Sequence, residues 1–156
     1  MPADSEPRRS AGPDLPHSWR PLGALIVASA LGLMLLALLI AVWIGLGDSV
    51  RSQFTPFQRI TLVVLGLGFF ACYHALVRSR VVAREEGLTV VNGYRKRAFE
   101  WSQVIAVQLR RGAPWATLDL SDGTSISLIG IQGSDGDRAR RAVREIRATL
   151  AAHSPR

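Results

Sequence analysis

Hydrophobic and polar residues separate along this chain into two long apolar runs followed by shorter, alternating patterns. The first run, residues 22–46, carries no charged side chain, and the second covers residues 60–77. As helices, with a rise of ~1.5 Å per residue, they would be about 37 Å and about 27 Å long, close to the ~30 Å hydrocarbon core of a bilayer. The pattern therefore predicts two transmembrane helices joined by a short extracytoplasmic loop over residues 47–59.

Two alternative explanations of the first run fit the sequence less well. A secretory signal peptide has an apolar core of roughly 7–15 residues and a small-residue cleavage site. This run is longer, and Gly47-Asp48-Ser49-Val50 follows it. A buried helix of a soluble domain is also disfavoured, because the run has no polar face and the chain is too short to enclose it. We therefore expect a multi-pass membrane protein.

Basic residues near the ends of the two runs indicate the orientation, because cytoplasmic segments of membrane proteins are enriched in Lys and Arg. The loop contains only Arg51 and Arg59, whereas basic residues are frequent before the first run and in residues 78–97. This asymmetry predicts a plasma-membrane protein with both termini in the cytoplasm. Trp19 and Trp43 lie near the two ends of the first run, where aromatic rings favour the membrane interface.

The two ends of the chain are expected to lie outside any folded domain. Residues 1–21 are rich in proline and have no apolar period, so they cannot bury enough surface to offset the entropy of ordering. We interpret them as a disordered cytoplasmic arm, and residues 152–156 as a short tail.

Small residues recur at four-residue spacing in both runs and are candidates for helix packing. They are Ala24, Ala28 and Gly32 in the first run and Gly68 and Cys72 in the second. Such spacing lets helix backbones approach closely, within one hairpin or in a homo-oligomer. The alternative is that Ala and Gly are simply common in membrane helices, and the sequence does not separate the two explanations.

After the second run the pattern changes to period-two alternation interrupted by turn signals. Strands are expected at residues 81–85, 88–91, 94–101, 103–110, 115–120 and 124–129. The turns are Glu86-Gly87, Asn92-Gly93 and Asp122-Gly123, and Asn-Gly is the strongest short hairpin signal. The sequence thus predicts an antiparallel sheet of five or six strands on short connections.

The last segment, residues 134–151, has the period of an amphipathic helix. Its apolar stripe consists of Ala139, Val143, Ile146 and Leu150. Arginines occupy much of the rest of its surface, and Ser134 or Asp135 is a suitable N-cap residue. We expect the narrow stripe to lie against an open face or end of the sheet.

Three motifs of this segment resemble those of bacterial PH-like domains. They are the strand start Glu86-Gly87-Leu88, Trp101 followed by Val104-Ile105, and the hairpin Leu118-Asp119-Leu120-Ser121-Asp122-Gly123. Such domains occur in small actinobacterial membrane proteins with two helices ahead of the domain, including a low-molecular-weight mycobacterial antigen. The resemblance implies an α+β fold: a two-helix transmembrane hairpin, then, over residues 78–151, a small antiparallel sheet or partial barrel closed by a C-terminal amphipathic helix. We expect at most six strands where a full PH domain has seven.

The resemblance also suggests a candidate site, since PH domains elsewhere bind phosphoinositides through basic residues at their first hairpin. Arg95, Lys96 and Arg97 follow the Asn92-Gly93 turn in a comparable place. Three readings stay open: a specific headgroup site, unselective contact with the anionic cytoplasmic leaflet, or no membrane role. Trp101 and Trp115 are expected in the core of the sheet rather than at a ligand.

The net charge of +7 invites a nucleic-acid partner, but all but one of the 19 basic residues are Arg and many flank the apolar runs. No helix-turn-helix, zinc-finger or ribonucleoprotein motif is present, so the membrane surface is the expected partner of this charge.

An enzyme is not expected either. The single Cys72 lies in the second run, and His17, His74 and His153 fall in separate segments. The sequence therefore predicts no catalytic residue, metal site or cofactor.

Two functions remain. In the first, the protein presents a PH-like interaction module at the cytoplasmic membrane face and binds an unknown membrane or cytoplasmic protein, together with the lipid surface. In the second, it is an accessory or scaffold subunit of a membrane transport or envelope-biogenesis complex, and its helices make the essential contacts.

Overall fold

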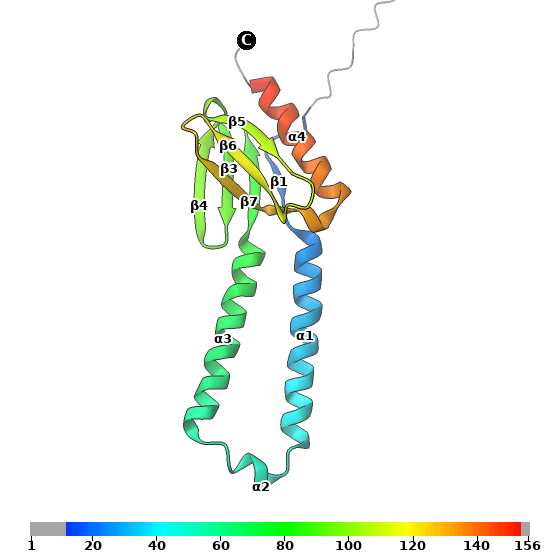
Figure 1. Ribbon diagram of the computed structural model, residues 1–156, viewed down its shortest axis with the longest axis vertical. Coiled ribbons are helices and arrows are strands. Elements are labelled where there is room, and N and C mark those ends of the chain that lie inside the picture. Colours follow the sequence, from blue (N-terminus) through cyan, green and yellow to red (C-terminus); the bar gives the residue numbers. More distant parts are fainter. Residues whose placement is uncertain (1–11, 154–156) are drawn as a thin grey trace, which may run out of the picture.

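A computed structural model describes residues 12–153 and shows a long helical hairpin that carries a β-rich domain at one end (Figure 1). The helices are α1 (Leu22–Gly45), α2 (Asp48–Arg51), α3 (Pro56–Arg78) and α4 (Asp137–His153). The strands are β1 (His17–Trp19), β2 (Arg80–Arg84), β3 (Gly87–Asn92), β4 (Arg95–Glu100), β5 (Val104–Gln108), β6 (Trp115–Leu120) and β7 (Ser125–Gln132). Two short 3-10 helices, η1 (Trp101–Gln103) and η2 (Gly133–Asp135), precede β5 and α4.

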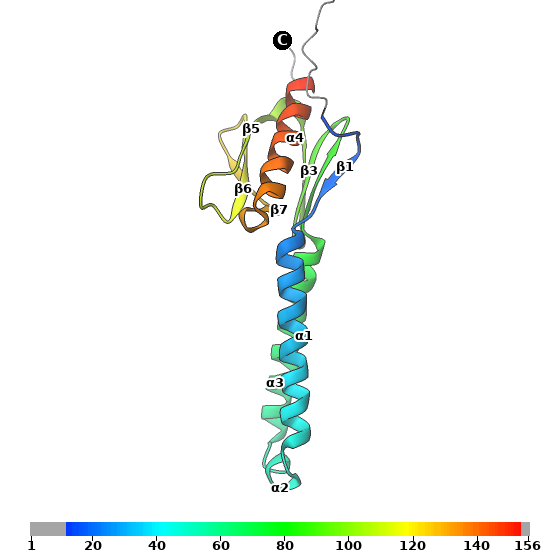
Figure 2. The ribbon, with the colours of Figure 1, turned by 90° about the vertical axis from the view of Figure 1, so that its right-hand side faces the viewer.

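The strands form two antiparallel sheets, in the orders β1-β2-β3-β4 and β5-β6-β7. Their inner faces share one apolar core, and α4 lies across the open end between them (Figure 2). The predicted α+β fold is confirmed, as are all six strands expected from the period-two pattern. The apolar stripe of the last helix is buried as expected. That helix begins at Asp137, so the N-cap prediction is wrong, and Ser134 and Asp135 belong to η2.

A seventh strand, β1, lies in the segment predicted to be a disordered arm. Its residues pair with β2, and Trp19 with Val81. Trp19 is 8% exposed in the domain core, and its Nε1 donates a hydrogen bond to Glu145 Oε2 at 2.8 Å. The predictions of a disordered arm at residues 17–19, of an interfacial Trp19 and of only six strands are therefore wrong. Residues 1–11 and 154–156 lie outside the described part of the chain.

The position of β1 changes the domain organisation, because β1 precedes α1 and β2 follows α3. The helical hairpin is therefore inserted into the connection between the first two strands of one seven-stranded domain. Pairing of β1 with β2 brings the start of α1 and the end of α3 to the same end of the domain (Figure 1).

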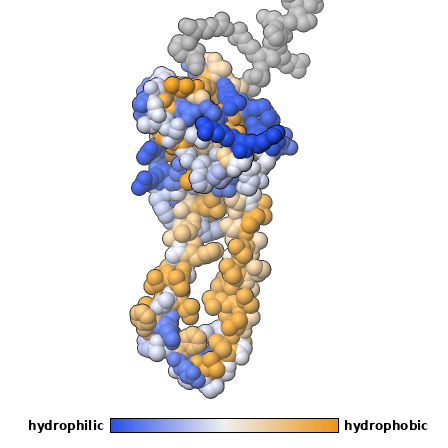
Figure 3. Space-filling view, viewed as in Figure 1, coloured by the Kyte–Doolittle hydropathy of each residue, from blue (hydrophilic) through white to orange (hydrophobic). Residues whose placement is uncertain are grey.

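Helices α1 and α3 occupy the two apolar runs, and each is long and apolar enough to cross a membrane. None of their residues is buried, and Figure 3 shows an almost continuous apolar surface over both. Helix α3 begins earlier than the run suggested, because Thr55 and Gln58 form a capping box ahead of it. Arg59 consequently lies in the first turns of α3 rather than in the loop.

Candidate functional site

The start of α1 is fixed to the domain by η2. Asp135 Oδ1 accepts a hydrogen bond from the backbone N–H of Gly23 at 3.0 Å. The first N–H groups of a helix have no partner within the helix, so this carboxylate acts as a cap supplied from the far end of the sequence. Gly23 admits the carboxylate because a side chain there would collide with it. The domain thus positions the first turn of α1.

The end of α3 is fixed by the β3–β4 turn. Ser79 Oγ donates to the carbonyl of Ala75 at 3.0 Å and accepts from the backbone N–H of Gly93 at 2.9 Å. Tyr94 Oη donates to the carbonyl of Ala71 at 3.1 Å. Ser79 is buried, so its two hydrogen bonds lie in a packed joint, whereas the Tyr94 hydrogen bond lies on the exposed side of the same joint. The Asn92-Gly93 turn predicted from the sequence therefore also anchors the end of α3 to the domain.

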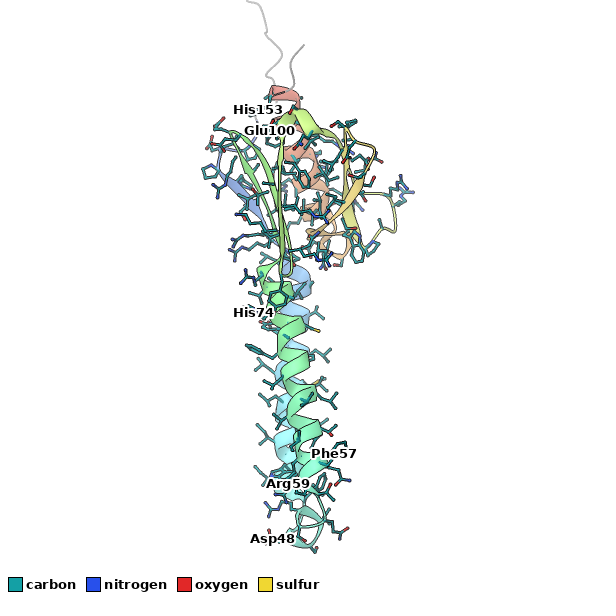
Figure 4. All side chains as sticks on the ribbon, turned by 90° about the vertical axis from the view of Figure 1, so that its left-hand side faces the viewer. Asp48, Phe57, Arg59, His74, Glu100 and His153 are labelled. Atoms are coloured by element: carbon teal, nitrogen blue, oxygen red, sulfur yellow. The ribbon has the colours of Figure 1, made fainter. Side chains whose placement is uncertain are left out.

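Both joints lie at one end of the domain. Figure 4 places His74 at this junction, Glu100 and His153 at the opposite end of the domain, and Asp48 and Arg59 at the far end of the hairpin. His74 Nδ1 lies 3.1 Å from the hydroxyl of Tyr94, so it takes part in the joint. The domain is held in one orientation relative to the helix axes, with the β3–β4 turn and η2 nearest the helices.

The basic triplet lies on β4, an edge strand that begins at the junction, and all three side chains are exposed. Strand pairing sets Arg97 opposite Val90 and Lys96 opposite Val91. Directly paired residues share a face of the sheet, and Val90 belongs to the core between the two sheets. Arg97 therefore points toward the second sheet and Lys96 to the outside, so the triplet does not form a single patch.

Arg95 and Arg97 line a groove of about 400 Å³ between β4 and β7, together with Ser125 and Ser127. Asn92 holds the groove together, because its Nδ2 donates to the Ser127 carbonyl at 2.6 Å. Two cationic side chains, two hydroxyls and apolar side chains of β3 and β7 suit an extended, acidic segment of a partner.

The expectation that this hairpin occupies the place of the first hairpin of a PH domain is wrong. It joins the third and fourth strands, whereas the first connection, between β1 and β2, contains the two long helices. Even without β1 the Asn92-Gly93 turn follows the second expected strand, and β1 moves it one connection further along the domain.

The two tryptophans expected in the core lie in different environments. Trp101 is 5% exposed, and its Nε1 donates to the carbonyl of Arg84 at 3.0 Å. Trp115 is 41% exposed, so its assignment to the core is wrong. In β6 the inward positions belong to Ala116 and Leu118, and strand alternation turns Trp115 to the outer face.

Contacts between α1 and α3 lie in the half of the hairpin near the domain. Ser29 Oγ and Tyr73 Oη are 2.8 Å apart. A side chain at Gly32 would meet the ring of Phe69 at 3.3 Å, so this glycine permits the approach of the ring. Toward the far end the helices diverge (Figure 3), and the apolar gap between them has two adjoining parts, one of about 420 Å³ at this contact and one of about 390 Å³ that Gly66 also lines.

The small residues predicted for helix packing are only partly at this contact. Ala28 and Gly32 line the gap, and Ala24 is half-buried near the start of α1. Gly68 has open space around it and Cys72 is exposed, so within one chain their assignment to the packing face is wrong. The large ring of Phe69, rather than a small residue, meets Gly32. Participation of Gly68 and Cys72 in a homo-oligomer stays a prediction.

A second basic cavity, of about 600 Å³, lies between the β5–β6 loop and the turn from η2 into α4. Arg110, Arg111 and Arg140 line it. The sequence pattern did not indicate this cavity, because its walls come from a loop and a helix start that are distant along the chain. Within residues 12–153, no group of three or more His, Cys, Asp or Glu side chains is arranged to hold a metal ion.

Comparisons with known proteins agree with this fold. Residues 78–149 match the family model described as "Bacterial PH domain". The chain is 31% identical over 140 residues to Uncharacterized protein Rv1417 of Mycobacterium tuberculosis and to Uncharacterized protein Mb1452 of Mycobacterium bovis. Each alignment covers 90% of this chain and 88% of the relative. No solved structure matches the chain. The resemblance to the low-molecular-weight mycobacterial antigen, suggested by the sequence, stays a prediction.

Proposed function

Because the chain belongs to the bacterial PH domain family, we propose that it is a two-span membrane protein that holds a PH-like interaction module at the cytoplasmic face. In this proposal α1 and α3 cross the plasma membrane, both termini are cytoplasmic, and the module binds a protein partner without catalysing a reaction.

The observation that carries the proposal is the insertion of the hairpin between β1 and β2. Since these two strands pair, the segments before α1 and after α3 belong to one folded unit and lie on one side of any membrane that the helices cross. The absence of buried residues in both helices also supports lipid as their surroundings.

The charges around the helices support the cytoplasmic side for the domain. Arg20, Arg78 and Arg80 flank the helix ends at the domain and are exposed. At the far end, the connection between the helices and the first turns of α3 contribute two basic residues, Arg51 and Arg59. Cytoplasmic flanks carry the excess of basic residues in membrane proteins.

Cysteine labelling in intact cells tests this topology. In a Cys72→Ser background, Ser52→Cys should react with an impermeant thiol reagent, whereas Ser134→Cys should react only after permeabilisation. Labelling of position 134 alone in intact cells would contradict the cytoplasmic placement of the domain. Labelling of both positions in intact cells would contradict the two-span arrangement.

The groove between β4 and β7 is the proposed partner site, because it combines Arg95 and Arg97 with two strand edges. Arg97→Glu should reduce crosslinked capture of a partner from native membranes, because an acidic segment would meet a like charge. Lys96→Glu is a matched control, since it makes the same charge change on the other face of the same strand. Equal loss of capture in both variants would contradict the groove.

The gap between the helices favours a second function, an accessory subunit whose membrane helices make the essential contacts. Gly66 lines this apolar gap and has no neighbour within 4 Å of the position of an added side chain. Gly66→Leu should fill the gap and release a partner helix, while Arg97→Glu leaves that partner bound. The opposite result favours the interaction module.

A further inference from the structure

The cavity beside the β5–β6 loop is basic and has no acidic wall. Its lining residues are Leu109, Arg110, Arg111, Gly112, Ala113, Pro114, Gly133, Ser134, Gly136 and Arg140. Three arginine residues therefore border one hollow of about 600 Å³, and its lining contains no aspartate or glutamate.

The backbone of this loop is held in place. The N–H of Ala113 donates to the carbonyl of Arg110 at 3.0 Å, and the N–H of Gly133 donates to the carbonyl of Pro114 at 2.9 Å. A side chain at Gly133 would collide with the carbonyl of Ala113, so a glycine is required where η2 meets the loop. The arginines therefore project from a fixed backbone.

Charge compensation at this cavity is incomplete. Within residues 12–153, neither Arg110 nor Arg111 forms an ion pair, and both are exposed. Arg140 contacts Asp137 at 3.1 Å, but this pair is exposed and of the weak surface kind. Guanidinium groups present planar, paired donors that match the oxygens of a phosphate group. The unmet charge therefore favours a phosphate-bearing anion.

The cavity also lies at the end of the domain nearest the helices. Its wall residue Ser134 precedes Asp135, which caps the first turn of α1 through Gly23. Figures 1 and 2 show the β5–β6 loop reaching toward the level at which α1 begins. Trp115, at the end of this loop, is exposed, and tryptophan favours the interface between lipid and water.

We infer that this cavity binds the phosphate group of an anionic membrane lipid. The inference rests on the proposed two-span placement, which brings the cavity to the level of the lipid headgroups. It is distinct from the groove at Arg95 and Arg97, which lies between β4 and β7. The same chemistry would also accept a soluble phosphate, and the experiment separates the two sources.

Native mass spectrometry of the full chain in a neutral detergent measures this binding directly. The protein is titrated with phosphatidylglycerol, phosphatidylcholine or inorganic phosphate. Arg110→Gln with Arg111→Gln removes two charges from the cavity. Arg141→Gln with Arg144→Gln is the matched control, because both residues are exposed on α4 and do not line the cavity.

We expect wild type and the control to retain phosphatidylglycerol in preference to phosphatidylcholine. The cavity double variant should bind phosphatidylglycerol at least about 10-fold more weakly, because it loses two guanidinium donors that could form charge-assisted hydrogen bonds to the phosphate. Millimolar inorganic phosphate should not displace the lipid. If the double variant does not fold, as judged by circular dichroism, Arg140→Gln tests the same cavity from α4 and should weaken binding severalfold.

Equal weakening in the cavity and control variants would overturn the inference in favour of unselective charge attraction. Displacement of the lipid by inorganic phosphate would overturn the lipid assignment and identify a soluble phosphate as the ligand. Because this measurement is made in detergent, its failure is distinguishable from failure of the topology, which the cysteine labelling reports.

Discussion

Replacement of Trp19 by Ala tests whether the short strand ahead of the helices is part of the domain. The side chain is 8% exposed, and its Nε1 donates to Glu145 Oε2 on α4. A buried tryptophan removes ~150–250 Å² from water, equivalent to about 4–6 kcal/mol at ~25 cal/mol per Å². Allowing for residual burial in the unfolded chain, the expected loss is about 3–5 kcal/mol, in the range measured for core aromatics.

The assay is thermal unfolding of the full chain in detergent micelles, followed by the circular dichroism signal of the β-sheet. For a domain of this size, a loss of that magnitude should lower the midpoint by more than about 10 °C. Trp43→Ala is the control, because Trp43 lies near the far end of α1, is 37% exposed and does not contact the domain. Trp19→Phe should fall between the two, since it keeps an aromatic ring and loses the hydrogen bond.

Similar midpoints for Trp19→Ala and Trp43→Ala would refute the reasoning. Strand β1 would then add nothing to the domain, and the hairpin would precede the domain instead of being inserted into it. The proposal that paired strands fix both helix ends on one side would lose its main support.

Three further predictions concern single positions. Trp101→Ala should lower the free energy of unfolding of the full chain by about 3–5 kcal/mol, measured by heat or denaturant. Trp115→Ala should change it by less than about 1 kcal/mol, because that side chain is exposed. Equal losses in the two variants would show that the strand register is wrong. Asp135→Ala should remove the cap of α1 and cost about 0.5–2 kcal/mol, with faster amide exchange in the first turn of that helix, and Asp137→Ala, at an exposed ion pair, should leave that exchange unchanged. Hydrogen bonds from the hydroxyl and then the backbone N–H of Thr124 hold the pKa of Asp122 below its usual value. The stability that this carboxylate contributes is therefore present above its unfolded pKa and is lost as the pH falls through its folded pKa. The difference in unfolding midpoint between wild type and Asp122→Ala should shrink on acidification, and a constant difference would exclude this contribution.

Long periodic segments were predictable from the sequence, and short ones were not. The two apolar runs, six strands and the last helix each contain enough residues for a period to appear. Strand β1 has three residues, and its partner β2 lies beyond both long helices. No local pattern could have assigned it, although an isolated tryptophan in a proline-rich segment was a signal of burial that we attributed to the membrane interface.

The predictions for Trp115 and for the basic triplet were wrong although the alternation of side chains along a strand, which can be read from the sequence, would have corrected them. In β6, Leu118 and Leu120 occupy inward positions, and the alternation of a strand then turns Trp115 outward. The same alternation separates Arg97 from Lys96, although they are adjacent in sequence. The cavity at Arg110, Arg111 and Arg140 is different, because a loop and a helix start meet there only through the tertiary fold.

The inserted hairpin also links folding of the domain to placement of the helices. In a flexible chain, closing a loop as long as that between Trp19 and Val81 would cost roughly 4 kcal/mol of entropy, more than a strand of three residues could offset by itself. The two antiparallel helices, in contact at Ser29 and Tyr73, place the ends of that loop side by side, where β1 and β2 pair. In the proposed two-span arrangement the bilayer would hold the helices in this geometry, so the complete domain should form only after both helices are inserted. Its orientation would then be set as it folds, with the β3–β4 turn, η2 and the arginine-lined cavity facing the lipid surface.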